Sequence, residues 1–148
     1  MRIERVTQPA DDVLEALARL LPQLSPGLTA PSHEQLVEIV AAPGTIFLVA
    51  RDDDDRIVGT LTLLLYRLPA GSRGWIHDVV VDEDARGRGI GEALTREALA
   101  LATAAGTERV DLTTRRHREA AHRLYERLGF VQRESDVYVW RPESCPAA

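Results

Sequence analysis

The sequence predicts an α/β (α+β) fold: a single domain, residues 1–148, with a mixed central sheet of six to seven strands flanked by about four helices. Three observations lead to this class. The 148 residues, 45% apolar and 28% charged, have the size and composition of one globular domain. Apolar residues recur with the helical period on both sides of a middle region that has the strand period. A strand, a helix and a strand also follow one another between residues 74 and 114, as in a right-handed crossover unit.

The first third of the chain predicts one strand and two helices. Residues 2–6 are typical of a short strand. Residues 10–24 carry apolar side chains at helical spacing behind two acidic residues, and Pro22 and Pro26 are expected to end that helix. A serine followed three residues later by a glutamine forms a capping box for a second helix over residues 32–42. The loop between these helices is of the kind that often shapes a binding site.

The middle of the chain is rich in β-branched residues. It predicts three strands, over residues 45–51, 56–68 and 74–81. Four consecutive aspartates, residues 52–55, join the first two strands. Four adjacent carboxylates suggest a cation site, but consecutive positions on a turn point in different directions. A solvated hairpin turn is therefore the favoured interpretation.

The last third predicts two helices and three strands. In chain order these are a helix over residues 90–106 with Gly106 as its stop, a strand over 109–114, a helix over 118–129, and two strands over 130–135 and 137–141. The two last strands are expected to form a hairpin. The complete order, β-α-α-β-β-β-α-β-α-β-β, gives a mixed sheet with hairpins at its ends.

Charge and cysteine content exclude several classes of function. The net charge of −5 disfavours binding to nucleic acid or to an anionic membrane. The single cysteine, Cys145, forms no internal disulfide and builds no metal site with its neighbours. Neither a signal peptide nor an apolar run long enough to span a membrane is visible. The expected location is cytoplasmic, without metal, nucleic-acid or membrane partners.

The segment HDVVVDEDARGRGIGEAL, residues 77–94, places three glycines at alternate positions where a helix should begin. A P-loop is excluded because the chain contains no lysine. A dinucleotide-binding fingerprint is excluded because its last glycine would fall on Glu92 or Leu94. A turn that is glycine-rich by chance is disfavoured, since each glycine costs roughly 0.5–1 kcal/mol relative to alanine in regular structure.

An anion-binding turn explains all features of this segment. Glycines allow several backbone N–H groups at a helix N-terminus to point at one anion, and Arg86 and Arg88 add positive charge. The apolar strand before the turn offers its backbone to an extended, amide-bearing ligand. A pyrophosphate with an amide-containing arm describes coenzyme A.

Two motifs of this sequence resemble those of the GNAT family of N-acetyltransferases. The first is Arg-Gly-Arg-Gly-Ile-Gly at residues 86–91, which matches the central Arg/Gln-x-x-Gly-x-Gly/Ala pattern of that family. The second is AAHRLYERLGF at residues 120–130, which matches its Leu-Tyr-x-x-Leu-Gly-Phe pattern. The spacing of the motifs and the order of the elements agree over essentially the whole chain. The resemblance implies a GNAT-like fold with acetyl-CoA as cosubstrate.

The resemblance also implies which residues hold the cosubstrate. The fourth strand pairs with the pantetheine arm, the glycine turn binds the pyrophosphate, and one histidine of the later helix faces the cofactor. These positions are Val79, Val80, Val81, Arg86, Gly87, Arg88, Gly89, Ile90, Gly91, Glu92 and His122. Arg118 stands where many members have an asparagine. With Arg115 and Arg116 it approaches phosphates of the cofactor or an acidic substrate, or it is solvated.

Three residues are candidates for catalysis by the same resemblance. Tyr125 aligns with the tyrosine that often protonates the leaving thiolate, and its alternative role is packing through the ring. His77 replaces the glutamate of glucosamine 6-phosphate acetyltransferases; it is either the general base or an interior histidine. Asp78 is the second candidate base. It points to the opposite face from His77 unless a β-bulge alters the alternation.

The function that follows is direct transfer of an acetyl group from acetyl-CoA to a primary amine. The acceptor is a small-molecule amine or a peptide amine that no motif identifies. Two alternatives stay open: a catalytically inactive CoA-binding sensor or regulatory module, and a nucleotide-binding protein that uses the same turn. The family often dimerises, sometimes through its C-terminal strands, and the apolar residues at 137–140 are compatible with a homodimer.

Overall fold

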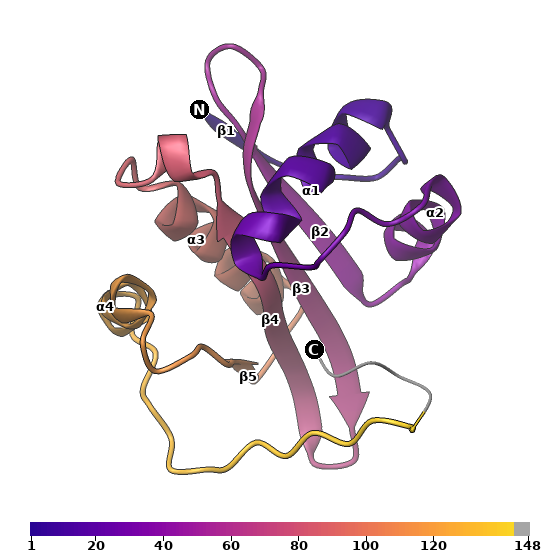
Figure 1. Ribbon diagram of the computed structural model, residues 1–148. Helices are drawn as coiled ribbons and strands as arrows, with labels where there is room; N and C mark the ends of the chain where they lie inside the picture. Colours follow the sequence, from indigo (N-terminus) through magenta and orange to yellow (C-terminus); the bar gives the residue numbers. More distant parts are fainter. Residues whose placement is uncertain (144–148) are drawn as a thin grey trace.

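The computed structural model describes residues 1–143 of the chain (Figure 1). Within these residues it contains strands, α-helices and one short 3-10 helix, η1. In chain order they are β1 (Arg2–Arg5), α1 (Asp11–Leu24), α2 (His33–Ala41), β2 (Thr45–Arg51), β3 (Ile57–Leu68), β4 (Gly71–Val81), η1 (Glu83–Ala85), α3 (Ile90–Ala104), β5 (Arg109–Leu112) and α4 (Glu119–Arg127). Cys145 lies outside the described residues.

The five strands form one sheet in the order β1-β2-β3-β4-β5. Neighbouring strands from β1 to β4 run antiparallel, whereas β5 runs parallel to β4. Helices α1 and α2 cover one face of the sheet, and α3 covers the other (Figure 1). The α/β class, the mixed sheet and the number of flanking helices are confirmed.

Strand β2 shows how the sheet is held between the two helix layers. Its residues are buried on both faces, because alternate side chains enter different cores. Leu48 belongs to the core under α3, with Leu61 and Leu94. Phe47 and Val49 belong to the core under α1 and α2. The sheet is therefore fixed from both sides, which provides a rigid base for the end of β4.

The prediction of six to seven strands is wrong for the described residues, which form five. The segments expected as strands over 130–135 and 137–141 have no strand structure. A strand exists only where its backbone pairs with a neighbour, and this segment leaves α4 and runs away from the edge of β5 (Figure 1). Its apolar side chains stay exposed, Val131 to 84% and Trp140 to 84%. Alternating residues predicted extended backbone, but they did not determine a pairing partner.

The end of the first helix also differs from expectation. Pro22 lies inside α1, which continues to Leu24 and ends at Ser25. Proline removes one N–H donor and crowds the carbonyl four residues earlier, and here only two helical residues follow it, so the disturbance falls at the end of the helix. The capping box at Ser32 is confirmed, since its hydroxyl accepts a hydrogen bond from the Gln35 amide at 3.1 Å.

The aspartate turn between β2 and β3 is a hairpin, as expected. The Asp52 carboxylate accepts hydrogen bonds from the amides of Asp54 at 3.1 Å and Arg56 at 2.9 Å. The next three aspartates are exposed. Across residues 1–143, none of the helices combines the length and apolar composition that a membrane crossing requires.

Candidate active site

A β-bulge interrupts β4 at the centre of the candidate site. Thr60 pairs with Val80 and Thr62 pairs with His77, so Asp78 and Val79 together face the single residue Leu61 of β3. Asp78 has a positive φ of 51°. This left-handed conformation is costly for most residues, but aspartate tolerates it better than β-branched residues do. The bulge that the sequence left open is present.

The bulge turns the consecutive side chains of His77 and Asp78 to the same face of the sheet, the face covered by α1 and α2. Ile76 and Val79 pack in the core under α3, whereas Val80 packs under α1 and α2. His77 stacks on Trp75 with ring centroids 5.9 Å apart. Asp78 lines a cavity on the α1 and α2 face. The side chain of His77 is exposed, so the interpretation as an interior histidine does not hold.

The cavity that contains the Asp78 side chain has a volume of about 440 Å³. Helices α1 and α2, their connecting loop and three strands contribute to its wall. The lining residues are Leu17, Leu21, Thr29, Ala30, Pro31, Gln35, Glu38, Ile39, Phe47, Thr60, Thr62 and Asp78. The loop between the first two helices thus shapes a cavity, as expected. No sequence pattern pointed to Glu38, Thr60 or Thr62, because they come from separate elements.

At the edge of β4 that faces β5, the two strands separate after Ile76. The two strands pair only from Arg73↔Arg109 to Ile76↔Leu112. The next residues of β4, 77–81, have no partner in β5, and their backbone forms an open edge. This edge carries Val79, Val80 and Val81, the residues expected to pair with an amide-bearing ligand.

The glycine turn follows this open edge. Gly87 and Gly89 have φ values of 76° and 75°, and Gly89 is the N-cap residue of α3 without a side-chain hydrogen bond. The first helical bond of α3 runs from the Ala93 amide to the Gly89 carbonyl, at 2.9 Å. Among the described residues, the backbone amides of 87–92 have no hydrogen-bond acceptor. They form an array of donors at the positive end of a helix dipole, which suits a bound anion.

The three glycines of the turn differ in what their positions require. A Cβ atom at Gly87 or Gly89 would have no neighbour within 4 Å, so backbone conformation is what requires glycine there. A Cβ atom at Gly91 would lie 3.4 Å from Leu124 of α4 and 3.7 Å from Val81. Both are ordinary van der Waals distances, so packing against α4 does not by itself require glycine at this position.

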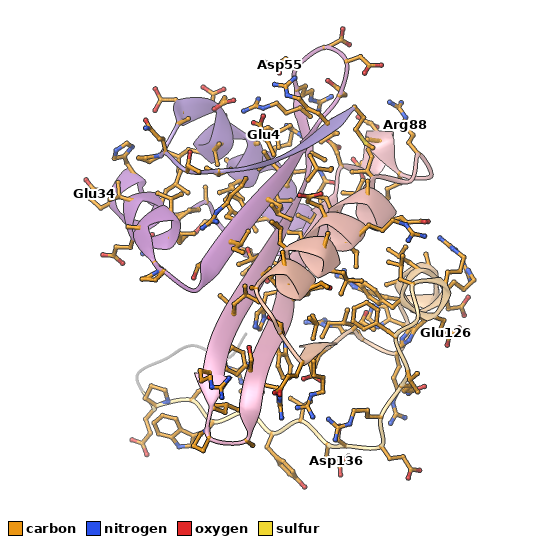
Figure 2. All side chains as sticks on the ribbon, turned by 180° about the vertical axis from the view of Figure 1, so that it is seen from behind. Glu4, Glu34, Asp55, Arg88, Glu126 and Asp136 are labelled. Atoms are coloured by element: carbon orange, nitrogen blue, oxygen red, sulfur yellow. The ribbon has the colours of Figure 1, made fainter. Side chains whose placement is uncertain are left out.

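The charged residues of the turn are held by local contacts. Nε of Arg86 donates to the Val81 carbonyl at 3.2 Å, and Nη2 of Arg88 donates to the Asp84 carbonyl at 3.2 Å. Figure 2 shows Arg88 projecting from this turn. Hydrogen bonds from Arg96 and then Arg127 lower the pKa of Glu92. Its negative charge is thereby balanced next to the array of amides.

Asp82 is a residue whose importance sequence reasoning missed. It follows β4 directly and is only 2% exposed. Its carboxylate pairs with Arg19 of α1 and with Arg56 at 2.9 Å, and it accepts a hydrogen bond from Gln23 at 3.4 Å. This cluster fixes the start of the glycine turn to α1. In the sequence, Asp82 is an acidic residue directly after a predicted strand. Such a residue cannot be distinguished from one in an ordinary exposed turn.

Tyr125 lies on α4, with its ring edge-on to Phe130 at 5.6 Å between centroids. Burial raises the pKa of Tyr125 above its usual 10.0, while the nearby Arg118 guanidinium lowers it by a smaller amount. The phenol therefore stays protonated at neutral pH and keeps a proton to donate. Arg118 donates to the Leu24 carbonyl at 2.6 Å, so it connects the start of α4 to the end of α1.

Among the described residues, His122 has no hydrogen bond to the glycine turn. Its Nε2 lies 3.2 Å from the Arg115 carbonyl. His122 lines a separate hollow between α4 and the C-terminal segment, whose lining also includes Arg116 and Asp136. Contact between His122 and a cofactor stays a prediction. Within residues 1–143, no group of three His, Cys, Asp or Glu side chains is placed to hold a metal ion.

The site combines an open edge of β4, a turn of unpaired amides and a cavity on the α1 and α2 face of the sheet. This arrangement suits a protein that binds an extended anionic ligand next to a second, smaller substrate. The chain belongs to the acetyltransferase (GNAT) family, whose model matches residues 11–130. It is therefore an acetyltransferase by family, and members of this family use acetyl-CoA as cosubstrate. The sequence resemblance is confirmed.

Named relatives agree with this membership. The chain is 36% identical over 141 residues to the "Probable glucosamine 6-phosphate N-acetyltransferase 2" of Oryza sativa subsp. japonica, covering 88% of this chain and 83% of the relative. It is 36% identical over 89 residues to the mycothiol acetyltransferase of Beutenbergia cavernae. That match covers 60% of this chain but only 29% of the length of the mycothiol enzyme.

A solved structure shows the same fold over nearly the whole chain. It is described as "Putative acetyltransferase from Agrobacterium tumefaciens str. C58". The TM-score is 0.84 at 30% identity, with 95% of this chain and all of that chain covered.

Proposed function

We propose that the protein transfers the acetyl group of acetyl-CoA directly to a primary amine, with both substrates bound at once. The observation that carries this proposal is the geometry at the end of β4. There the open edge of residues 77–81 and the unpaired amides of residues 87–92 follow one another. The bulge at Asp78 turns a carboxylate from the same strand into the cavity on the opposite face. Donor and acceptor can thus approach one strand from two sides.

Acetyl-CoA fits the first side by its chemistry. The backbone of residues 79–81 offers hydrogen bonds to the amides of the pantetheine arm, as a neighbouring strand would. The amides of residues 87–92 offer donors to the pyrophosphate, and the charges of Arg86 and Arg88 add attraction. Glu92 does not oppose the anion, because Arg96 and Arg127 neutralise its carboxylate.

The chemistry of transfer requires a neutral amine, since an ammonium nitrogen has no lone pair for attack. We assign to His77 the acceptance of the ammonium proton, directly or through water, and to Asp78 the orientation of the ammonium group. The amine nitrogen then bonds to the carbonyl carbon, and the carbon–sulfur bond breaks. A backbone N–H at the bulge stabilises the negative oxygen.

Tyr125 completes the proton balance. In this scheme its phenol donates a proton to the departing thiolate, which leaves as free CoA. The attacking nitrogen loses its remaining extra proton to solvent as the amide forms, His77 releases its proton to solvent, and solvent reprotonates Tyr125. The raised pKa of Tyr125 supports this role, because the phenol is protonated when the thiolate departs.

The direct test is thiol release from acetyl-CoA with a panel of primary amines. We expect amine-dependent release, together with tighter binding of CoA than of ATP or NAD in calorimetry. Binding of CoA without thiol release under every amine would favour the inactive sensor module instead. Tighter ATP binding would favour the nucleotide-binding alternative. No observation on the described residues favours either of these over the enzyme.

His77→Gln and Asp78→Asn separate the two roles assigned to the bulge. Asparagine tolerates positive φ, so the bulge should persist in the second variant. His77→Gln is expected to lower kcat by roughly 10- to 100-fold with little change in the KM of the amine. Asp78→Asn is expected mainly to raise that KM. Equal effects of both variants on KM alone would contradict the assignment of His77 as base.

We also propose that a second copy of the chain covers the C-terminal segment, residues 130–141. Tyr138 and Trp140 of this segment are 90% and 84% exposed. Strand β5 has one unpaired edge among the described residues, because its partner is β4 alone. An exposed extended segment and an open strand edge are complementary. Light scattering should show a dimer that Trp140→Asp dissociates; a monomeric unmodified protein contradicts this assembly.

A further inference from the structure

We infer that the acceptor is a small cationic amine with an apolar body and without a phosphate or carboxylate group, recognised by Asp78 and Glu38. This inference rests on the proposed acetyl transfer and goes beyond it by naming the chemical class of the acceptor. It comes from the wall of the 440 Å³ cavity on the α1 and α2 face.

The charge of the cavity wall is entirely negative. Glu38 of α2 and Asp78 of β4 reach it from different elements, and none of its described lining residues is arginine or histidine. Neither carboxylate has an ion-pair partner among residues 1–143. In contrast, Glu92, Asp82 and Glu108 each pair with arginine. Two unpaired carboxylates facing one cavity attract a cation and repel an anion.

Two arginines, on α1 or in contact with its C-terminal end, form hydrogen bonds outside the cavity wall. Arg118 donates to the Leu24 carbonyl at 2.6 Å, and Arg19 is bound by the Asp82 carboxylate and by the Ile57 carbonyl. An acceptor phosphate in the cavity would therefore find no free guanidinium in the described wall. This separates the chain from a relative whose name specifies glucosamine 6-phosphate.

Apolar side chains make up most of the remaining wall. Leu17 and Phe47 are 5% and 6% exposed, and Leu21 and Ile39 lie beside them. They offer a surface for methylene groups or an aromatic ring. The volume is within the usual range for sites that hold small molecules, about 300–1,000 Å³.

Thr60 adds a hydroxyl group to the cavity wall. The residue is only 2% exposed and lines the cavity. A hydroxyl on the cavity wall can accept a hydrogen bond from a donor on the ligand. Thr60 lies opposite Val80, next to the bulge, so this donor is expected near the amine.

Two matched substrate pairs test the inference in the full-length protein. Phenethylamine and phenylalanine differ only in a carboxylate; glucosamine and glucosamine 6-phosphate differ only in a phosphate. Within each pair, we expect kcat/KM for the compound without the anionic group to be higher by about 100-fold or more. Equal or higher kcat/KM for phenylalanine or for glucosamine 6-phosphate overturns the inference.

Glu38→Gln tests the part played by the second carboxylate. We expect it to raise the KM for 1,8-diaminooctane by about tenfold and that for octylamine by less than about threefold. Glu15→Gln is the control: it removes the same charge from an exposed position on α1 outside the cavity. An effect of Glu38→Gln no larger than that of Glu15→Gln contradicts the role of Glu38.

A binding measurement distinguishes failure of this inference from failure of the proposed reaction. Thermal unfolding with saturating CoA should show stabilisation by phenethylamine and none by phenylalanine. If this selectivity appears while no amine is acetylated, the inference on the cavity holds and the proposed transfer is wrong. If amines are acetylated but phenylalanine stabilises the protein as much as phenethylamine, the transfer holds and the inference is wrong. Stabilisation by neither compound also overturns the inference.

Discussion

The two candidate sites on either side of β4 differ in the groups that form them. On the side of α3, the candidate cosubstrate site consists of backbone: an open strand edge and the amides of residues 87–92. On the side of α1 and α2, the candidate acceptor site consists of side chains, including Glu38, Thr60 and Asp78. Backbone recognition depends on a local run of glycines and is visible in a sequence. Side-chain recognition depends on residues that only the fold brings together.

The comparison predicts its largest effect for a change of backbone conformation on the α3 side. Gly89→Val places a β-branched residue at a φ of 75°. We expect acetyl-CoA affinity to fall by about 100-fold or more, because the turn must change shape to accept valine. Isothermal calorimetry measures this loss.

Gly106→Val is the matched control for that variant. Gly106 has the same φ of 75° at the other end of α3, again with no atom within 4 Å of a new Cβ. Both variants should lose similar stability, about 1–3 kcal/mol in urea unfolding, but only Gly89→Val should lose cofactor binding. Equal loss of acetyl-CoA affinity in both would show that strain, rather than the amide array, causes the effect.

The next effect separates chemistry from binding. Tyr125→Phe retains the edge-on contact with Phe130 but removes the proton. We expect kcat to fall by about 10- to 100-fold while the KM of acetyl-CoA changes less than about twofold. Steady-state kinetics measures both constants, and an unchanged kcat removes Tyr125 from the mechanism.

The pH dependence of kcat sharpens the same assignment. Burial raises the pKa of Tyr125 above 10.0, and the acid acts only in its protonated form. Its contribution to kcat is therefore complete at neutral pH and is lost only as pH rises through the raised pKa. A fall in kcat at pH 8 to 9 that Tyr125→Phe abolishes would contradict a raised pKa.

The smallest expected effect tests whether the two sides are coupled. Asp82→Asn weakens the cluster that ties the start of the glycine turn to Arg19 and Arg56. We expect a loss of about 2 kcal/mol in the free energy of unfolding and a decrease in acetyl-CoA affinity of only about threefold. Asp84→Asn, at an exposed position of η1, should change neither quantity. Equal effects of the two variants contradict a positioning role for Asp82.

These differences explain how far sequence reasoning reached. The glycine turn, the capping box at Ser32 and the aspartate hairpin were predicted because each depends on neighbours within a few residues. The fold class followed from the same local periods. The positions of the bulge and of Asp82 could not be derived, because one depends on the register with β3 and the other on distant arginines.

The prediction of two C-terminal strands was wrong for the same reason, because strand formation depends on residues distant in the sequence. Val137 and Val139 have the alternation of a strand, yet a strand requires a partner that the alternation does not specify. Pro22 is the opposite case. Proline is a strong signal for the end of a helix, yet α1 continues past it to Leu24. Local rules therefore predict which conformations a segment favours, while pairing and burial decide among them.

Hydrogen–deuterium exchange with and without acetyl-CoA tests the central claim most directly, because it reports on backbone amides. Binding should slow exchange at residues 79–81 and 87–92, where β4 is open and the turn amides have no acceptor. The amides of residues 131–141 should not change. Protection confined to the hollow beside His122, with the glycine turn unchanged, would contradict recognition by the turn.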